Sequence, residues 1–283
     1  MPIGASLAFE TVSFTGSDST QVPQGVINWT FFEGALLAIC LRTADSDKVI
    51  GTAVVVAPGL AVSATHVIQG DLPAIMDGTA SLLCTGITST GVQLWRVRKA
   101  SMCPADDDTC FLSLEMASSL EPESRLRRFA LTARAPTIGE SLHVIGYQLP
   151  EVNRSAPNGG FSAGGALYLA TGVVTDFFPN GRDKRLMPYP SIEIACGTLC
   201  GMSGGAVLDR DGCLMGVISR GWDFEDGSGP SYAAWIVGAL LRAVEIPWPP
   251  GFYRQPTRLW DIDPAALVIA GRENVRIAEH RPE

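Results

Sequence analysis

Several features are scarce in this chain, and each scarcity excludes a class of protein. Lys and Arg number 21 against 29 Asp and Glu, which gives a net charge of -8. The densest basic cluster is short (Arg125, Arg127 and Arg128), so no nucleic-acid partner is expected. No apolar run reaches about 18 residues, and the first residues lack the basic start and apolar core of a signal peptide. We therefore expect neither a membrane span nor secretion.

Cysteine is also sparse. The seven cysteines (40, 84, 103, 110, 196, 200 and 213) are an odd number, and most lie in apolar, strand-like sequence. We expect them to be reduced, as in a cytoplasmic protein. Cys196 and Cys200 are spaced like half of a zinc site, but none of the three histidines lies near them in sequence. The sequence therefore predicts no metal and no cofactor.

What is present points to a globular, all-β protein. Hydrophobic residues make up 46% of the 283 positions and charged residues 18%, and the length suits about two domains. Short strand-like runs recur between turn residues, in two sets separated by the more polar stretch 118–139. The first set is 35–42, 48–57, 60–68, 74–87, 91–100 and 109–115; the second is 140–148, 165–177, 190–196, 204–209, 212–219 and 231–235. One helix is expected, over 233–245, where Ala, Leu, Arg and Glu are frequent.

The stretch GMSGGAV puts Ser203 among glycines and before a strand. A serine hydroxyl becomes a nucleophile only beside a base and near donors for the oxyanion. Three histidines could be that base. His280 lies in the charged end of the chain, His143 lies inside an alternating run typical of a strand, and His66 ends the strand-like LAVSATH.

Three segments, in this order, carry a family resemblance: VSATHV, DTCFLSL and GMSGGAV. They resemble the three signature segments of the trypsin-like (chymotrypsin-fold) serine proteases, over roughly residues 30 to 240, and are most similar to compact, disulfide-free bacterial members. The resemblance implies two perpendicular six-stranded β-barrels with a C-terminal helix and tail. It divides the chain into an N-terminal arm (1–25), a first barrel (26–125), a second barrel with the helix (126–246) and a tail (247–283).

The resemblance implies a serine endopeptidase with a triad of His66, Asp108 and Ser203. Asp106 and Asp107 precede Asp108, but only Asp108 is followed directly by the strand pattern TCFLSL, so the other two are interpreted as loop residues. Backbone N–H groups of Gly201 and Ser203 would form the oxyanion hole. The expected substrate is a protein or peptide.

The resemblance also outlines a substrate site from Gly197, Ser219, Arg220, Gly221 and Tyr232. Gly197 would form the base of the pocket for the side chain before the cut bond, Ser219 and Gly221 its walls, and Tyr232 would lie near the base. An uncharged base predicts small or apolar side chains there. Arg220 could instead favour an acidic side chain, or be a solvent-facing charge.

The sequence departs from the family where many secreted members carry an aspartate directly before the nucleophile. Here that residue is Met202, so a newly cut N-terminus would have no carboxylate to pair with. Either the oxyanion hole is formed as synthesised or something else orders it. Because an always-active peptidase is hazardous inside a cell, a regulatory protein partner or ligand is a further hypothesis.

The tail contains Trp248, Phe252, Tyr253 and Trp260 among prolines. These rings could either pack back across the barrels, which we favour, or form a docking surface for another protein.

Two rival functions remain open. GMSGG and the GFSAG around Ser162 both satisfy the G-x-S-x-G pattern of α/β-hydrolase esterases, although β-like sequence rather than a helix follows each serine. Alternatively, the chain is a catalytically silent binding module that keeps the protease fold.

Overall fold

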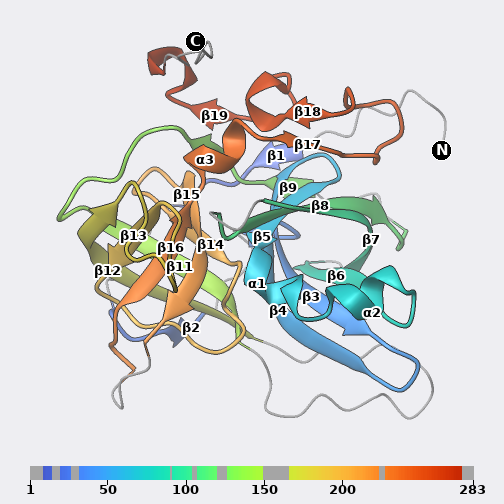
Figure 1. The fold of residues 1–283 in the computed structure, drawn as a ribbon, viewed down its shortest axis with the longest axis horizontal. Coiled ribbons are helices and arrows are strands. Elements are labelled where there is room, and N and C mark those ends of the chain that lie inside the picture. The colour runs from blue at the N-terminus through green and yellow to red at the C-terminus, as the bar shows by residue number, and fades with distance from the viewer. Residues whose placement is uncertain are drawn as a thin grey trace.

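The computed structural model describes residues 9–14, 20–26, 32–89, 91–103, 107–119, 126–148, 166–222 and 227–275. The fold is built from strands, as the alternating and β-branched runs predict. Two barrels lie side by side, with the C-terminal segment across one end of both (Figure 1). Within the described residues, no helix has the length and apolar character needed to cross a membrane.

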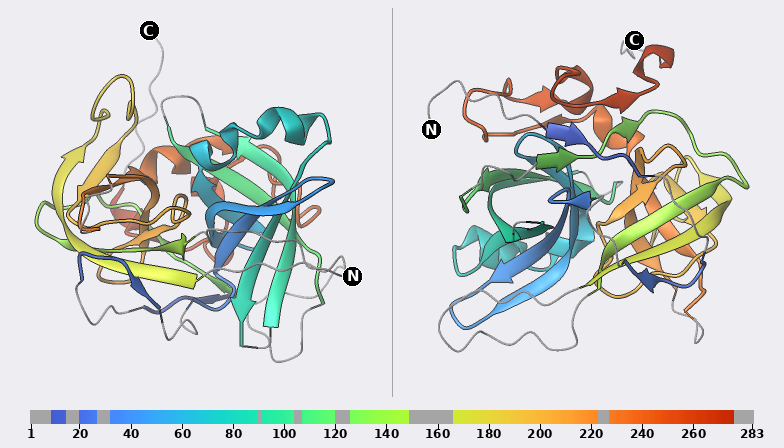
Figure 2. Two further views of the ribbon diagram at one scale, coloured as in Figure 1. Left: turned by 90° about the horizontal axis from the view of Figure 1, so that it is seen from below. Right: turned by 180° about the vertical axis from the view of Figure 1, so that it is seen from behind.

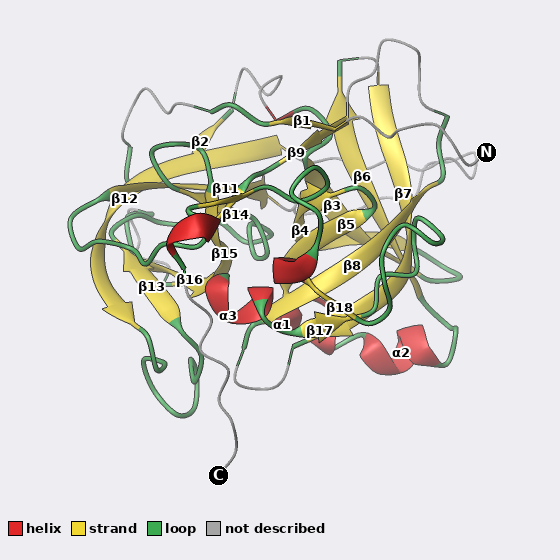
Figure 3. Cartoon of the chain, turned by 90° about the horizontal axis from the view of Figure 1, so that it is seen from above, coloured by secondary structure: helices red, strands yellow, loops and turns green. Residues whose placement is uncertain are grey.

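The first barrel is a closed sheet of six strands in the order β3-β4-β5-β8-β7-β6. Its strands are β3 (Leu36–Arg42), β4 (Asp47–Ala57), β5 (Leu60–Ala64), β6 (Ser81–Thr88), β7 (Gly91–Met102) and β8 (Thr109–Met116). Two short helices, α1 (Thr65–Gln69) and α2 (Leu72–Met76), connect β5 to β6. The strand-like run expected from residue 74 therefore begins with helix and becomes strand only at Ser81. Figure 3 shows α1 near the junction of the two barrels.

The second barrel also closes with six strands, because β14 pairs with both β11 and β15. Its strands are β11 (Ser141–Gln148), β12 (Ala166–Phe178), β13 (Ser191–Ile194), β14 (Ala206–Leu208), β15 (Leu214–Gly221) and β16 (Ser231–Trp235). The two-barrel fold expected from the sequence is thus confirmed.

The helix expected over 233–245 is much shorter than predicted. Only Val237–Leu240 is helical (α3), while Ala233 and Ala234 belong to β16, which pairs with β13 and β15. Helix propensity is a weak preference of less than about 1 kcal/mol per residue, and pairing on both sides of a strand overrides it. Past the single turn of α3, the chain returns to extended structure as β17 (Ala243–Val244).

Short strands at both ends of the chain extend the barrels. β1 (Phe9–Thr11) pairs with β9 (Leu126–Arg128), and β2 (Gln24–Gly25) pairs with β12. β10 (Leu131–Thr132) lies between β15 and β19 (Ile269–Ala270), and β17 pairs with β18 (Thr257–Arg258). Two 3-10 turns, η2 (Leu259–Asp261) and η3 (Arg272–Asn274), complete the C-terminal segment. Figure 2 shows β1 beside β9 from behind.

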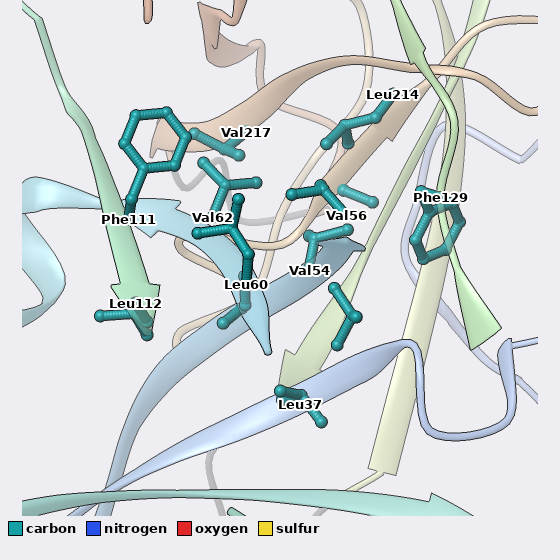
Figure 4. Packing of buried hydrophobic residues seen from close by; sticks show 14 of the residues in the cluster. Leu37, Val54, Val56, Leu60, Val62, Phe111, Leu112, Phe129, Leu214 and Val217 are labelled. Carbon is teal, nitrogen blue, oxygen red and sulfur yellow. The ribbon is translucent and has the colours of Figure 1, made fainter. Parts of the chain in front are cut away.

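One hydrophobic cluster joins the first barrel to the second. Val54, Val62 and Phe111 of the first barrel share this cluster with Leu214 and Val217 of β15 (Figure 4), and all five are at most 1% exposed. The interior of the second barrel is a separate cluster. Because the inter-barrel contact is a packed apolar core, it fixes the position of one barrel against the other.

The tail packs back on the first barrel, as the sequence interpretation favoured. The Tyr253 hydroxyl donates to the Pro58 carbonyl over 2.7 Å, and the Trp248 N–H donates to Ser113 Oγ over 3.1 Å. Gly59 approaches both Trp248 and Pro249 so closely that a side chain at this position would contact them. Tyr253 is buried, whereas Phe252 is 51% exposed.

Candidate active site

His66 lies in the first turn of α1, directly after β5. Hydrogen bonds of the preceding residue fix this turn: the Thr65 N–H donates to the Asp108 carbonyl, and Thr65 Oγ1 donates to the Thr109 carbonyl over 2.7 Å. The His66 side chain is 35% exposed. The imidazole is thus held from one side and open on the other.

Asp108 precedes β8 and contacts His66 twice. Its Oδ2 lies 2.8 Å from His66 Nδ1, and its Oδ1 accepts the His66 backbone N–H over 3.0 Å. Because a carboxylate only accepts hydrogen bonds, Nδ1 must carry the proton in this pair. Nε2 is then the unprotonated nitrogen, able to accept a proton.

Two further side chains support this carboxylate. Ser219 Oγ donates to Asp108 Oδ2 over 2.5 Å, and the Tyr189 hydroxyl lies 2.5 Å from the same Ser219 Oγ. Since the Ser219 proton is directed at Asp108, Tyr189 is the donor in its own bond. Burial, together with the Asp108 charge, raises the pKa of Tyr189 to about 12, so its hydroxyl keeps its proton. Ser219 thus donates to Asp108, and Tyr189 fixes the direction of the Ser219 proton.

The neighbouring Asp107 has a different role. It is buried, and its Oδ1 accepts from the Thr109 N–H (3.1 Å) and from Thr109 Oγ1 (2.8 Å). Its Oδ2 lies 3.4 Å from Arg242 Nε. Burial raises the pKa of Asp107 to about 6. Asp107 lies before β8, as expected of a loop residue, and its bonds to Thr109 brace the start of that strand. Asp106 lies outside the described residues.

Ser203 lies in a loop between the two barrels, from Leu199 to Gly205, called the Ser203 loop below. The two glycines that follow the serine are there because the backbone is crowded. A Cβ at Gly204 would lie 2.1 Å from Ser63 Oγ and 2.2 Å from the Thr52 carbonyl oxygen, and Gly204 has φ = +79°. A Cβ at Gly205 would lie 2.3 Å from the Ile145 carbonyl oxygen. The two glycines of the GMSGG motif that follow Ser203 are thus required by close backbone packing.

The loop places Ser203 at the barrel that carries His66. The Thr52 N–H in β4 donates to the Ser203 carbonyl over 2.9 Å, and Gly51 lies against both that carbonyl and Val67, the residue after His66. Ser203 is half-buried. In the described part of the chain, no hydrogen bond joins Ser203 Oγ to His66. Such a bond is commonly long in unliganded enzymes and tightens with substrate.

The start of the Ser203 loop is a tight turn. The Met202 N–H donates to the Leu199 carbonyl over 3.1 Å, and Gly201 has φ = +96°. A positive φ at the third position alone defines a type II turn, which favours glycine there. In a type I turn the Cys200–Gly201 peptide would be turned over. Its carbonyl would then point in the direction in which its N–H now points. Among the described residues, neither the Gly201 nor the Ser203 N–H has a hydrogen-bond acceptor.

The expected pocket residues lie close together but leave little space. A Cβ at Gly221 would lie 2.1 Å from Thr198 Oγ1, and one at Gly197 would lie 1.8 Å from the Gly227 carbonyl oxygen. Ser219 is 1% exposed, and its hydroxyl binds Asp108. Positions 197 and 221 therefore have no room for a side chain larger than that of glycine.

The other two expected substrate residues face a polar cluster. Tyr232 pairs with Arg220 across the β15–β16 ladder, and its hydroxyl donates to Glu193 Oε2 over 2.7 Å. The Arg182 guanidinium lies 4.9 Å from the centre of the Tyr232 ring. Arg220 itself is exposed.

Of the other two histidines, the structure describes His143. His143 is buried in β11, where its Nδ1 lies 2.9 Å from Thr171 Oγ1 and its ring meets Phe14 edge-on. Burial lowers the pKa of His143, as suits a neutral core histidine. His280 and Ser162 lie outside the described residues.

None of the seven cysteines forms a disulfide. Five of them are buried, Cys213 is half-buried and Cys200 is exposed. In the ranges that the structure describes, no cluster of three or more His, Cys, Asp or Glu side chains could hold a metal ion.

Met202 stands where many secreted members of the family carry an aspartate, and substitutions at this position test whether a carboxylate could be accommodated there. Its side chain is fully buried inside the second barrel. We expect Met202→Asp to lower the free energy of unfolding by about 3–5 kcal/mol, because the new carboxylate would be buried without a partner. Met202→Leu, which conserves volume, is expected to cost less than about 1.5 kcal/mol. Denaturant unfolding measures both, and equal stabilities would show that a cation can reach this position.

The chain was compared with known protein sequences and solved structures. No curated protein sequence matches the chain. Among solved structures, the active form of the Rv3671c protease from M. tuberculosis is 16% identical, with a TM-score of 0.49 over 80% of this chain and 92% of that chain. Deg5 is 20% identical, with a TM-score of 0.47 over 72% of this chain and 84% of that chain. The protease domain of MamO from Magnetospirillum magneticum is 12% identical, with a TM-score of 0.49 over 72% of this chain and 93% of that chain.

The model of the trypsin-like peptidase domain matches residues 51–217, from Gly51 in β4 to Val217 in β15. That match spans more than half of the 283 residues, and the chain belongs to the trypsin-like peptidase family.

Proposed function

We propose that this protein is a serine endopeptidase that cleaves peptide bonds through an acyl-enzyme. The observation that carries the proposal is the pairing of His66 with Asp108, which leaves Nε2 as a base at the barrel junction where the Ser203 loop lies. Family membership and the two-barrel fold support it.

In the proposed reaction, Ser203 Oγ attacks the carbonyl carbon of the scissile bond while His66 Nε2 takes the hydroxyl proton. The carbonyl π electrons move to oxygen, and the Gly201 and Ser203 N–H groups stabilise this oxyanion. As the tetrahedral intermediate collapses, the C–N bond breaks and His66 gives its proton to the leaving amine. Water then attacks the ester by the same route, and Ser203 is regenerated.

The substrate backbone has a place to bind along β15. Residues 220 and 221 pair with β16 on one side, while β14 pairs with β15 no further along than Val217. Among the described residues, no strand pairs with the other edge of residues 219–221, and we infer that an extended peptide binds there. Strand addition of this kind supplies affinity through main-chain hydrogen bonds.

The crowding around Gly197, Thr198 and Gly221 favours a small side chain before the cut bond. Arg220 and Arg182, near Tyr232, favour an acidic side chain further upstream in the substrate. These assignments rest on the family correspondence and on the close contacts described above.

Unbiased peptide-library cleavage tests this function. We expect endopeptidase cuts after small residues such as Ala, Ser or Val, with Ser203→Ala protein as the blank. Cleavage mainly after Lys or Arg would keep the peptidase but overturn the pocket assignment. No cleavage above the blank would favour the silent binding module.

Regulation by a partner or ligand stays a prediction. The purified full-length chain, with nothing added, is the test: cleavage at full rate under these conditions would contradict it.

A further inference from the structure

Thr52 is a buried side chain of the first barrel that binds the Ser203 loop of the second. Residue 52 lies in β4 and is 0% exposed. Its Oγ1 donates to the Gly201 carbonyl over 2.9 Å and accepts the Tyr147 N–H of β11 over 2.9 Å. Its N–H donates to the Ser203 carbonyl over 2.9 Å, and its own carbonyl accepts from Ser63 Oγ over 2.6 Å. Thr52 thus binds the carbonyls of both residues that flank Met202, Gly201 and Ser203.

Most backbone groups of the Ser203 loop from Gly201 to Gly205 are hydrogen-bonded. The carbonyls of Gly201 and Ser203 are bound by Thr52, and the carbonyl of Met202 accepts the Gly205 N–H over 2.9 Å. The Gly204 N–H donates to the Ile218 carbonyl over 2.7 Å. From Gly201 to Gly205, the N–H groups without an acceptor in the described structure are then those of Gly201 and Ser203. They are the two that the proposed reaction uses for the oxyanion.

The apolar contacts of the Ser203 loop do not by themselves explain the direction in which its peptide N–H and carbonyl groups point. Met202 is buried, and Gly146 packs so closely on it that a Cβ there would lie 2.8 Å from the Met202 Cα. Such packing holds the loop in place, but dispersion and hydrophobic contacts are not directional. A peptide can reverse its N–H and carbonyl with little change in apolar contact. A hydrogen bond to a defined carbonyl resists reversal of the peptide that carries this carbonyl. Thr52 holds the Gly201–Met202 and Ser203–Gly204 peptides in this way, and these adjoin the two peptides whose N–H groups the proposed reaction uses.

We propose that Thr52 is a positioning residue that holds the Ser203 loop in its oxyanion-binding form, in place of the buried ion pair that the sequence lacks. The proposal rests on the serine-peptidase function. The Thr52 hydroxyl has one proton and two acceptor sites, and its two bonds fix the direction of that proton towards Gly201. The loop is then ordered by the fold of the chain, with no cleaved terminus required.

Thr52→Val tests the hydroxyl while keeping a β-branched side chain of similar size. The substitution leaves the Tyr147 N–H and the Gly201 carbonyl without their shared partner. We expect kcat to fall about 100-fold with KM within about threefold, since loss of one oxyanion donor typically costs about 10²–10³ in kcat. Thr52→Ser, which keeps the hydroxyl, is expected to hold kcat within about fivefold.

The matched control is Thr171→Val. Thr171 is another buried threonine in a strand, but its Oγ1 lies 2.9 Å from His143 Nδ1, in the second barrel. We expect Thr171→Val to lower the melting temperature as Thr52→Val does and to leave kcat within about threefold of the wild type. If Thr52→Val does not fold, Thr52→Ala gives the same comparison with Thr52→Ser.

A second measurement separates orientation from general damage. A peptide aldehyde forms a hemiacetal with the active serine, and the oxygen of this adduct occupies the oxyanion site. Its inhibition constant is expected to rise about 100-fold in Thr52→Val, in step with the fall in kcat. Binding of an uncleaved substrate, measured in the Ser203→Ala background, is expected to change by less than about threefold on adding Thr52→Val.

The outcomes are distinct. The positioning role is overturned if Thr52→Val keeps kcat within threefold, if Thr171→Val loses as much, or if aldehyde and substrate binding weaken equally. A wild-type protein that neither cleaves peptides nor binds the aldehyde would instead overturn the proposed function.

Discussion

Replacing Ser203 by alanine is expected to lower kcat about a millionfold, to the residual rate that the oxyanion hole and substrate binding supply. The change removes only the hydroxyl oxygen of a half-buried side chain, and the carbonyl that accepts from Thr52 remains. The fold and substrate binding should therefore persist. Hydrolysis of a fluorogenic peptide, followed with active-site titration of the wild type, measures the loss.

Ser162→Ala is the matched control, because Ser162 lies in the other G-x-S-x-G sequence. It is expected to retain wild-type kcat. A fluorophosphonate probe adds a covalent readout: mass spectrometry should find the adduct on the peptide that contains Ser203. An adduct on Ser162, or equal labelling of wild type and Ser203→Ala, would show that the nucleophile has been misassigned.

Features that depend on the local chain could be predicted from the sequence. Gly204 and Gly205 are glycines because a Cβ at either position would meet backbone of another strand, and this crowding leaves a motif in consecutive residues. Asp108 could be preferred over its neighbours because the strand begins at Thr109, directly after it. The two sets of strand-like runs likewise anticipated the two barrels, since alternation and turn residues are local signals.

Features that depend on distant pairing could not be predicted. Thr52 binds a carbonyl 149 positions further along the chain, and Tyr189 reaches Ser219 across 30 positions. Neither contact leaves a pattern in the neighbouring sequence: a threonine in a strand and a tyrosine before one are ordinary residues there. Only the closed barrels show that these side chains face the site.

The same reason explains the two differences at the ends of the fold. The segment from Ala233 has a composition typical of a helix. Its first residues nevertheless form the end of β16, because they pair with β13 on one side and β15 on the other. At the other end, Gln24 and Gly25 were expected in an irregular arm and instead pair with β12. Next to them, the Gln21 carbonyl accepts the Gly197 N–H over 2.8 Å. In both places the secondary structure is determined by pairing with the exposed edge of a sheet and not by the local sequence.

Asp108→Asn is expected to lower kcat about ten-thousandfold at neutral pH, the loss that this change causes in another enzyme with the same triad. The carboxylate accepts from His66 Nδ1, the His66 N–H and Ser219 Oγ. An asparagine has one acceptor oxygen, and its NH₂ must face one of these partners. The His66 backbone N–H can only donate, so the amide oxygen takes the place of Oδ1 and the NH₂ takes the place of Oδ2, beside Nδ1. The amide then donates to Nδ1 and forces the proton onto Nε2. The imidazole then cannot take the serine proton.

The control for that substitution is one residue away. Asp107→Asn keeps an acceptor oxygen for Thr109 and loses the charge that faces Arg242. We expect it to cost stability, by roughly 1–3 kcal/mol for a weakened buried polar contact, and to leave kcat within about tenfold. Steady-state kinetics at pH 8 compares the two, with melting temperatures recorded in parallel. If Asp107→Asn lost activity as severely as Asp108→Asn, the loss would follow from damage to the start of β8, and the orientation of His66 by Asp108 would no longer explain it.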